Sequence, residues 1–145
     1  MSTSSLDELG VLDKASAQLP TVMSLKEDWI LRRSAWARKD IDELLSFFTP
    51  DAVYHNMPLV PLIGIDAIRE TLAMFVTPAE RIEFEVLAIA AAGDLVFTER
   101  VDHFEMMGKR VSLPVAGVFQ VRDGKIAAWR DYFDMQTWMT GLRPA

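Results

Sequence analysis

The feature that most constrains the fold is a series of extended segments in the second half of the chain. Short turns that contain glycine separate these segments, at residues 93–94, 107–108 and 123–124. Turns of this kind join neighbouring strands in antiparallel hairpins. The sequence therefore predicts four consecutive antiparallel strands, over Arg81–Ala91, Leu95–Glu105, Lys109–Val121 and Lys125–Phe133.

The first half of the chain has helical periodicity instead. A capping-box spacing precedes an amphipathic segment that ends near Lys39. A second such spacing, Asp40 with Glu43, opens a helix whose apolar side includes Phe48 and which Pro50 stops. Because so few residues separate the two helices, we expect them to form a hairpin.

The remaining segments complete an α+β pattern. We predict a short strand over Asp51–Met57, a turn-rich segment over Pro58–Gly64, and a third helix that Asp66 caps and that ends at about Val76. Met135–Leu142 could form a closing helical turn. One curved sheet around a helix hairpin leaves a concave, partly apolar cavity, which is a natural site for a small molecule.

Composition excludes several classes of function. With 145 residues the chain has room for one domain, which we expect over residues 21–145 after a loosely ordered arm over residues 1–20. A net charge of −6 argues against nucleic acid or an anionic membrane as a partner, and the absence of cysteine removes thiolate chemistry. No segment has the pattern of a membrane span or a secretory signal, so we expect a cytoplasmic protein.

Two aspartates fall on strand faces that should be apolar. Residues two apart in a strand share a face, so Asp102 lies between Arg100 and Phe104, and Asp131 lies between two aromatic residues. An ionised carboxylate among aromatic rings is unfavourable unless a cation pairs with it. Beside a cavity, and with Arg100 available, the two aspartates have the make-up of an acid/base couple with separated pKa values.

The residue pattern leaves other interpretations open. An Asp and an Arg two apart on a strand often form a surface salt bridge, and Tyr54 and Asn56 are also typical of a buried phenol and a turn. His55 and His103 are too few for a catalytic zinc, which usually has three protein ligands. No glycine-rich phosphate loop is present, so a nucleotide cofactor has no support. We therefore predict neither a metal nor a cofactor. From pattern alone, the chain is a cavity-bearing α+β domain for which acid/base catalysis is one option.

Three groups of residues resemble motifs of the limonene epoxide hydrolase family, in the family's order and spacing. They correspond to its water-binding segment (Tyr54–Leu59 with Gly64–Ala67), its central motif (Thr98–Asp102) and its C-terminal signature (Gly117–Gln120, Gly124–Ala127 and Trp129–Asp134). The resemblance extends from about Trp29 to Trp138, and parts of the last motif occur across the wider ketosteroid-isomerase-like cone superfamily.

The resemblance implies a fold and a mechanism. The fold is an α+β cone, in which a curved, mostly antiparallel mixed sheet wraps around N-terminal helices and encloses a deep apolar cavity. The mechanism is a one-step, cofactor-free attack of water on an epoxide that gives a vicinal diol. Asp102 would be the general acid and Asp131 the general base. Tyr54 and Asn56 would hold the water, and Arg100 would orient both carboxylates.

The resemblance also implies an apolar epoxide as substrate, terpene-like or alicyclic as in limonene-1,2-epoxide, and a homodimer. A sheet that exposes Val111 and its neighbours would favour the dimer. The chain departs from the family pattern in a bulkier Val60–Ile63 and in a shorter hairpin at Met106-Met107, which would reshape the entrance. The expected lining of the cavity is Phe75, Phe104, Leu113, Val115, Phe133 and Trp138.

Three other functions fit a cone-shaped cavity. A ketosteroid-type isomerase also uses Asp and Tyr, but would not need the Arg100–Asp102 pair together with Asn56. A non-catalytic module that binds a hydrophobic ligand would tolerate Asp102→Asn and would show no pH-dependent turnover. An epoxide-opening cyclase, in which a substrate hydroxyl replaces water, should lack the water-holding pair, Tyr54 and Asn56.

Overall fold

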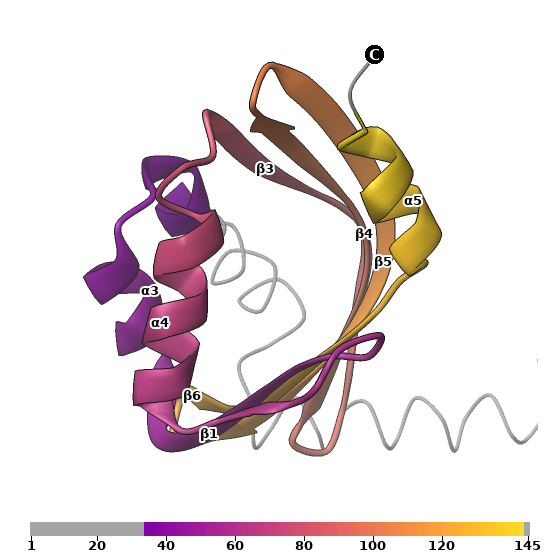
Figure 1. The fold of residues 1–145 in the computed structure, drawn as a ribbon. Coiled ribbons are helices and arrows are strands. Elements are labelled where there is room, and N and C mark those ends of the chain that lie inside the picture. Colours follow the sequence, from indigo (N-terminus) through magenta and orange to yellow (C-terminus); the bar gives the residue numbers. More distant parts are fainter. Residues whose placement is uncertain (1–33, 144–145) are drawn as a thin grey trace, which may run out of the picture.

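One strongly curved six-stranded sheet organises the computed structural model, which describes residues 34–143 (Figure 1). The strand order is β2-β1-β6-β5-β4-β3, and all neighbours are antiparallel except β1 and β6, which are parallel. The strands are β1 (Phe48–Asn56), β2 (Leu62–Ile63), β3 (Arg81–Ala92), β4 (Leu95–Met106), β5 (Lys109–Arg122) and β6 (Lys125–Tyr132). The α+β cone and its mixed sheet are therefore confirmed.

Helices close the concave side of this sheet. Residues 34–38 are helical, and they are followed by α3 (Ile41–Ser46), α4 (Ile65–Phe75) and α5 (Met135–Gly141). In Figure 1, α3 and α4 lie side by side across the interior from β3, β4 and β5, while α5 lies beside β5. Within the part of the chain that is described, no helix is long and apolar enough to cross a membrane.

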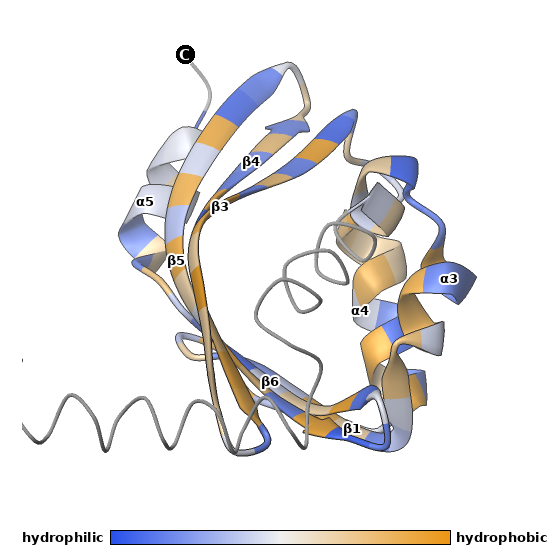
Figure 2. Ribbon diagram, turned by 180° about the vertical axis from the view of Figure 1, so that it is seen from behind, coloured by the Kyte–Doolittle hydropathy of each residue, from blue (hydrophilic) through white to orange (hydrophobic). Residues whose placement is uncertain are grey.

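The alternation of polar and apolar residues explains how the core forms. In β4 every second residue from Val96 to Met106 is buried, and the apolar and polar bands along the strands are visible in Figure 2. The buried side chains meet those of the helices in one core that includes Trp36, Leu44 and Leu72. The long strands and their three turns match the predictions. Two of the turns place consecutive residues at positive φ, as tight hairpins require.

The predicted second helix ends earlier than its apolar residues suggest. α3 stops at Ser46, and Phe48 instead begins β1, where it pairs with Ile126 and stacks on Trp129 at 6.0 Å. Pro50 lies inside this strand, where the β1–β6 register shifts between Phe48 and Val53. A proline is tolerated at such an irregularity because it has no N–H to give to the ladder.

Two further predictions around β1 needed correction. The N-cap of α4 is Gly64, not Asp66, and no side chain caps this helix end. Asp66 lies in the first turn, where a negative charge stabilises the N-terminus of a helix. The segment expected to be only turns, residues 58–64, contains β2, which pairs with β1. The expected arm over residues 1–20, and the first helix before Ser34, lie outside the described residues.

Two side chains lie on the opposite side of the sheet from the one expected. Simple alternation separates Ile126 from Trp129, but a bulge between β5 and β6 shifts the register, and both are buried in the core. Val111 was expected to be exposed, yet it is 2% exposed and lies under Gly141 of α5. The exposed residues of β5 alternate with the buried ones and include Ser112 and Ala116.

Candidate active site

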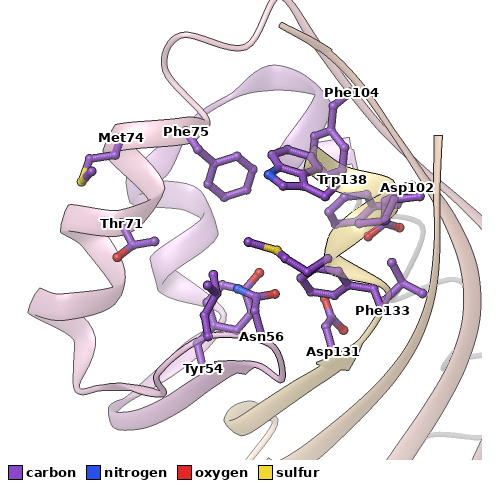
Figure 3. Close-up of a pocket in the computed structure, with 15 residues that line it drawn as sticks. Tyr54, Asn56, Thr71, Met74, Phe75, Asp102, Phe104, Asp131, Phe133 and Trp138 are labelled. Carbon is purple, nitrogen blue, oxygen red and sulfur yellow. The ribbon is translucent and has the colours of Figure 1, made fainter. Parts of the chain in front are cut away.

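A cavity of about 310 Å³ lies between the concave face of the sheet, α4 and α5 (Figure 3). All six predicted lining residues contact it: Phe75, Phe104, Leu113, Val115, Phe133 and Trp138. Four of the five predicted polar residues contact it as well: Tyr54, Asn56, Asp102 and Asp131. Figure 3 shows Tyr54, Asn56 and Asp131 on one side of this space, with the rings of Phe75 and Trp138 opposite. The cavity therefore has an apolar wall and a polar end.

Pairing between distant strands brings the polar residues together. Asn56 of β1 pairs with Asp131 of β6 in the parallel ladder, and Tyr54 pairs with Trp129. Across the next strand, Gly117 of β5 is the register partner of Asp131. The polar residues of the site therefore lie up to 77 positions apart in sequence, from Tyr54 to Asp131, and only the pairing of β1 with β6 makes them neighbours.

Arg100 is the one predicted site residue that does not contact the cavity. It is 1% exposed, behind the two aspartates, and it uses all five N–H groups of its guanidinium. To Asp102 it donates from Nε to Oδ1 at 2.9 Å and from Nη2 to Oδ2 at 2.8 Å. To Asp131 it donates from Nη2 to Oδ2 at 2.9 Å and from Nη1 to Oδ1 at 3.2 Å. The fifth bond runs from Nη1 to Thr98 Oγ1 at 3.1 Å. Arg100 therefore positions both carboxylates and has no N–H left for a ligand.

Aromatic rings surround this ion cluster. The guanidinium carbon of Arg100 lies 5.2 Å from the centre of the Phe84 ring, 5.8 Å from Trp129 and 6.0 Å from Phe119. At these distances a cation is attracted by the ring faces. The rings also shield the guanidinium from water, which strengthens its electrostatic interactions with the two carboxylates.

The cluster favours one bound proton. Two ionised carboxylates and one guanidinium would leave a net negative charge out of water, which is costly. Burial, and then the nearby charge of Asp131, raise the pKa of Asp102, although Arg100 opposes this shift. For Arg100, burial lowers the pKa, but the two carboxylates outweigh it and raise the pKa above its ordinary value. Asp102 is therefore suited to hold the proton, beside a permanently charged Arg100.

Tyr54 supplies a neutral hydroxyl to the same end of the cavity. Burial, and then the charge of Asp131, raise the pKa of its phenol, so it stays protonated. Its ring stacks on Trp129 at 4.7 Å, and the side chain of Asn56 partly opposes the rise in the pKa of the phenol. A phenol and an amide next to a carboxylate can together hold one water molecule.

Nothing in this arrangement calls for a metal ion at the aspartates. Arg100 already occupies the position between the two carboxylates that a cation would take. His55 and His103 lie on the other strand faces, as predicted. His55 bonds to the carbonyl of Leu59, and His103 bonds to Ser112 and Glu85.

Sequence reasoning missed four supporting residues of the cluster: Phe84, Thr98, Gly117 and Trp129. Alternation places Thr98 and Trp129 on the same faces as the aspartates, and that signal could have identified them. Gly117 is less apparent. A methyl group there would lie 2.8 Å from Asp131 Oδ1 and 2.9 Å from Thr98 Oγ1, and would collide with Arg100 Nη1. Four further residues line the cavity and lie outside the expected set of six: Leu59, Thr71, Met74 and Met135.

Comparison with solved structures first identifies the fold class. A putative SnoaL-like polyketide cyclase from Shewanella putrefaciens CN-32 matches with a TM-score of 0.72 at 18% identity, over 81% of this chain and 94% of that one. A Catenulispora acidiphila protein with a ketosteroid isomerase-like fold matches with a TM-score of 0.68 at 20% identity, over 75% and 86%. At these identities the likeness shows the cone fold alone.

Closer similarity identifies the family. The model of the limonene-1,2-epoxide hydrolase catalytic domain matches residues 32–143, and the chain belongs to this family of epoxide hydrolases. Epoxide hydrolase EphG of Mycobacterium tuberculosis (strain ATCC 25618 / H37Rv) is 36% identical over 111 residues, which are 75% of this chain and 72% of EphG. The structure of an M. tuberculosis LEH-like epoxide hydrolase matches with a TM-score of 0.67 at 33% identity, over 76% and 82%.

The contacts around Gly117 lead to a first prediction. We expect Gly117→Ala to lower the free energy of unfolding by about 1–3 kcal/mol, as overpacking does, and to displace Arg100 from the aspartates. Chemical denaturation would measure the stability, and turnover of an epoxide substrate would report on the cluster. Gly141→Ala is the matched control, because its methyl group would lie 2.6 Å from Val111 Cγ2, remote from the cluster. Equal losses of turnover in the two variants would contradict the role assigned to Gly117.

Proposed function

We propose that this protein hydrolyses apolar cyclic epoxides to vicinal diols by direct attack of water. The observation that carries the proposal is a pair of aspartates, buried and joined through one guanidinium, at the polar end of an apolar cavity. Membership of an epoxide hydrolase family supports the same reaction.

The reaction needs an acid and a base at the same time. An epoxide is strained, but its oxygen leaves poorly as an alkoxide, so Asp102 donates its proton to that oxygen as the C–O bond breaks. Water is a weak nucleophile, so Asp131 takes one of its protons as the water oxygen bonds to the ring carbon. Asp102 is then ionised and Asp131 protonated, and the return of one proton from Asp131 to Asp102 restores the starting state.

The water is held from the β1 side of the site. Tyr54 and Asn56 belong to the strand that pairs with Asp131, so a water molecule bound to their polar groups would also reach that carboxylate. Holding the nucleophile in place removes part of the entropic cost of the reaction. Acid and base groups of this kind each contribute about 10²–10⁴ in rate.

The lining of the cavity suggests the class of substrate. Aromatic and aliphatic side chains form most of its wall, and Leu59 and Met74 add exposed apolar surface next to it. A volume of about 310 Å³ lies at the small end of the range for ligand pockets. We therefore propose a compact substrate of the limonene-1,2-epoxide type, alicyclic or terpene-like, without charged groups.

A single-turnover experiment in heavy-oxygen water tests the reaction. With a panel of cyclic and terminal epoxides, we expect the diol of the first turnover to carry the heavy oxygen, because water attacks the epoxide directly. Mass spectrometry of the product measures this. Unlabelled diol from the first turnover would indicate a covalent ester to the protein. The absence of diol from every epoxide would favour an isomerase or a binding module.

Substitution of the two aspartates tests their roles. We expect Asp102→Asn and Asp131→Asn each to lower kcat by at least about 100-fold, because each removes one proton-transfer group. Asp123→Asn, in an exposed hairpin turn, is the matched control and should keep the wild-type rate. Hydrolysis at the wild-type rate by Asp102→Asn or by Asp131→Asn would contradict the mechanism.

The raised pKa of Asp102 leads to a prediction about pH. Because Asp102 must be protonated to act as the acid, kcat should fall as the pH rises through its pKa, which burial holds above the ordinary value for aspartate. The same group contributes stability at low pH that is lost as the pH rises through the folded-state pKa. Measurements of kcat and of the free energy of unfolding against pH should both show a decline as the pH rises. Asp102→Asn should remove the decline in the free energy of unfolding. A kcat that increases over this interval would contradict the assignment.

We also propose a homodimer that forms through the convex face of the sheet. Phe97 and Tyr132 are 40% and 47% exposed there, and Ala116 lies next to Tyr132 in the register. Large outward aromatic side chains beside small ones give a surface on which a second copy can pack. Light scattering should show a dimer that Ala116→Glu converts to a monomer. The control, Ala73→Glu on the exposed side of α4, should stay dimeric, and a monomeric wild type would contradict the proposal.

A further inference from the structure

The hydrogen bonds from Arg100 do not make Asp102 the protonated partner, because they are equal in number for the two aspartates and slightly shorter to Asp102. Arg100 donates two hydrogen bonds to Asp102, from Nε and Nη2, and two to Asp131, from Nη1 and Nη2. Both carboxylates are also buried to nearly the same degree, at 3% and 4% exposed. An acid/base pair needs unequal partners, so the difference must come from another group.

That group is Trp129. Its indole N–H donates to Asp131 Oδ1 at 2.6 Å, which gives Asp131 three donors. Among the described residues, Asp102 receives side-chain hydrogen bonds from Arg100 only. A hydrogen bond donated to a carboxylate stabilises its ionised form, and the effect is larger when the bond is short and buried.

We infer that the indole N–H of Trp129 decides which aspartate holds the shared proton, and thereby sets which one is the acid and which the base. This inference rests on the proposed function for its catalytic meaning. Trp129 does not line the cavity, so it acts as a positioning residue through Asp131. Its own orientation is fixed, because it is 1% exposed and its ring packs against Tyr54 at 4.7 Å and Phe119 at 4.8 Å.

The same bond selects the oxygen that accepts the proton from water. A carboxylate has about four acceptor sites, two on each oxygen. Trp129 and Arg100 Nη1 take both sites on Asp131 Oδ1, whereas Oδ2 receives only Arg100 Nη2. One acceptor site therefore remains, on Oδ2, and the geometry assigns the base function to that atom.

Few other ionisable groups compete for this proton. Tyr54, from β1, is the other titratable group at the cavity end of the cluster, and it stays protonated. From the opposite face of β4, the charge of His103 lowers the pKa of Asp102, but it comes last among the causes, after burial, Arg100 and Asp131. In the described structure neither group hydrogen-bonds to a carboxylate oxygen of Asp102 or Asp131, so Trp129 is the source of the asymmetry.

Trp129→Phe tests the inference, because it removes the N–H and keeps an aromatic ring. The readout is carbon-13 NMR of aspartate carboxyl groups, with the Asp102 and Asp131 signals assigned from their Asn variants. In the wild type we expect Asp102 to be the protonated carboxyl. In Trp129→Phe the proton should be shared between both, kcat should fall about two- to tenfold, and KM should change by less than about twofold.

Trp36→Phe is the matched control. Trp36 contacts the Trp129 ring at 5.6 Å in the same aromatic cluster and has no hydrogen bond to Asp131, so the wild-type proton position should persist. Unchanged carboxyl signals in Trp129→Phe, or the same change in both variants, would overturn the inference. A wild type without epoxide hydrolysis would instead count against the proposed function, and the NMR result would still decide the position of the proton.

A second measurement applies if Trp129→Phe does not fold. The indole proton of Trp129 in the wild type should resonate at the low field typical of a strong hydrogen bond to a carboxylate. It should move towards the ordinary value in Asp131→Asn and stay nearly constant in Asp102→Asn. An indole signal that responds to neither variant would overturn the inference.

Discussion

The hydrogen-bonded ion cluster of Arg100, Asp102 and Asp131 is the interaction on which the rest of the structure depends. Moving a guanidinium and two carboxyl groups out of water is strongly unfavourable unless their hydrogen-bonding groups find partners. The structure provides these partners by bringing β4 and β6 to either side of Gly117 on β5, where no side chain intervenes. The curvature of the sheet and the aromatic layer around the guanidinium are thus conditions for the cluster.

The sequence predicts those parts of the fold that are decided locally. The four long strands follow from an alternation of period two and from turns with glycine, and both are visible within a few residues. The predictions that were wrong concern residues whose structure depends on partners far away in the sequence. Phe48 becomes a strand residue because Ile126 is available to pair with it, and Ile126 is buried because of a bulge against β5. No local pattern contains this information.

The candidate site, like the fold, could be predicted from the sequence only in part. Alternation, together with the family resemblance, identifies the polar residues that meet at the end of the cavity, because residues two apart share a face. It does not show that Arg100 lies behind the aspartates with every N–H in use, since that depends on contacts between β4 and β6. The importance of Gly117 and Trp129 is likewise a property of the assembled sheet, although each lies within the predicted C-terminal motif.

A neutral cluster reconciles an apolar cavity with acid/base chemistry. With one shared proton, the charges of Arg100 and one carboxylate balance, so the cavity above them need not be hydrated to offset a net charge. In the proposed mechanism an apolar epoxide then approaches the acid, and the water enters at the position set by Tyr54 and Asn56. The N–H of Trp129 acts within this neutral cluster. It adds no charge, and it changes the relative stability of two forms that differ only in which carboxyl bears the proton. In the inference drawn above, a single hydrogen bond makes that choice, because Arg100 donates two hydrogen bonds to each carboxylate and the indole adds a third on one side only.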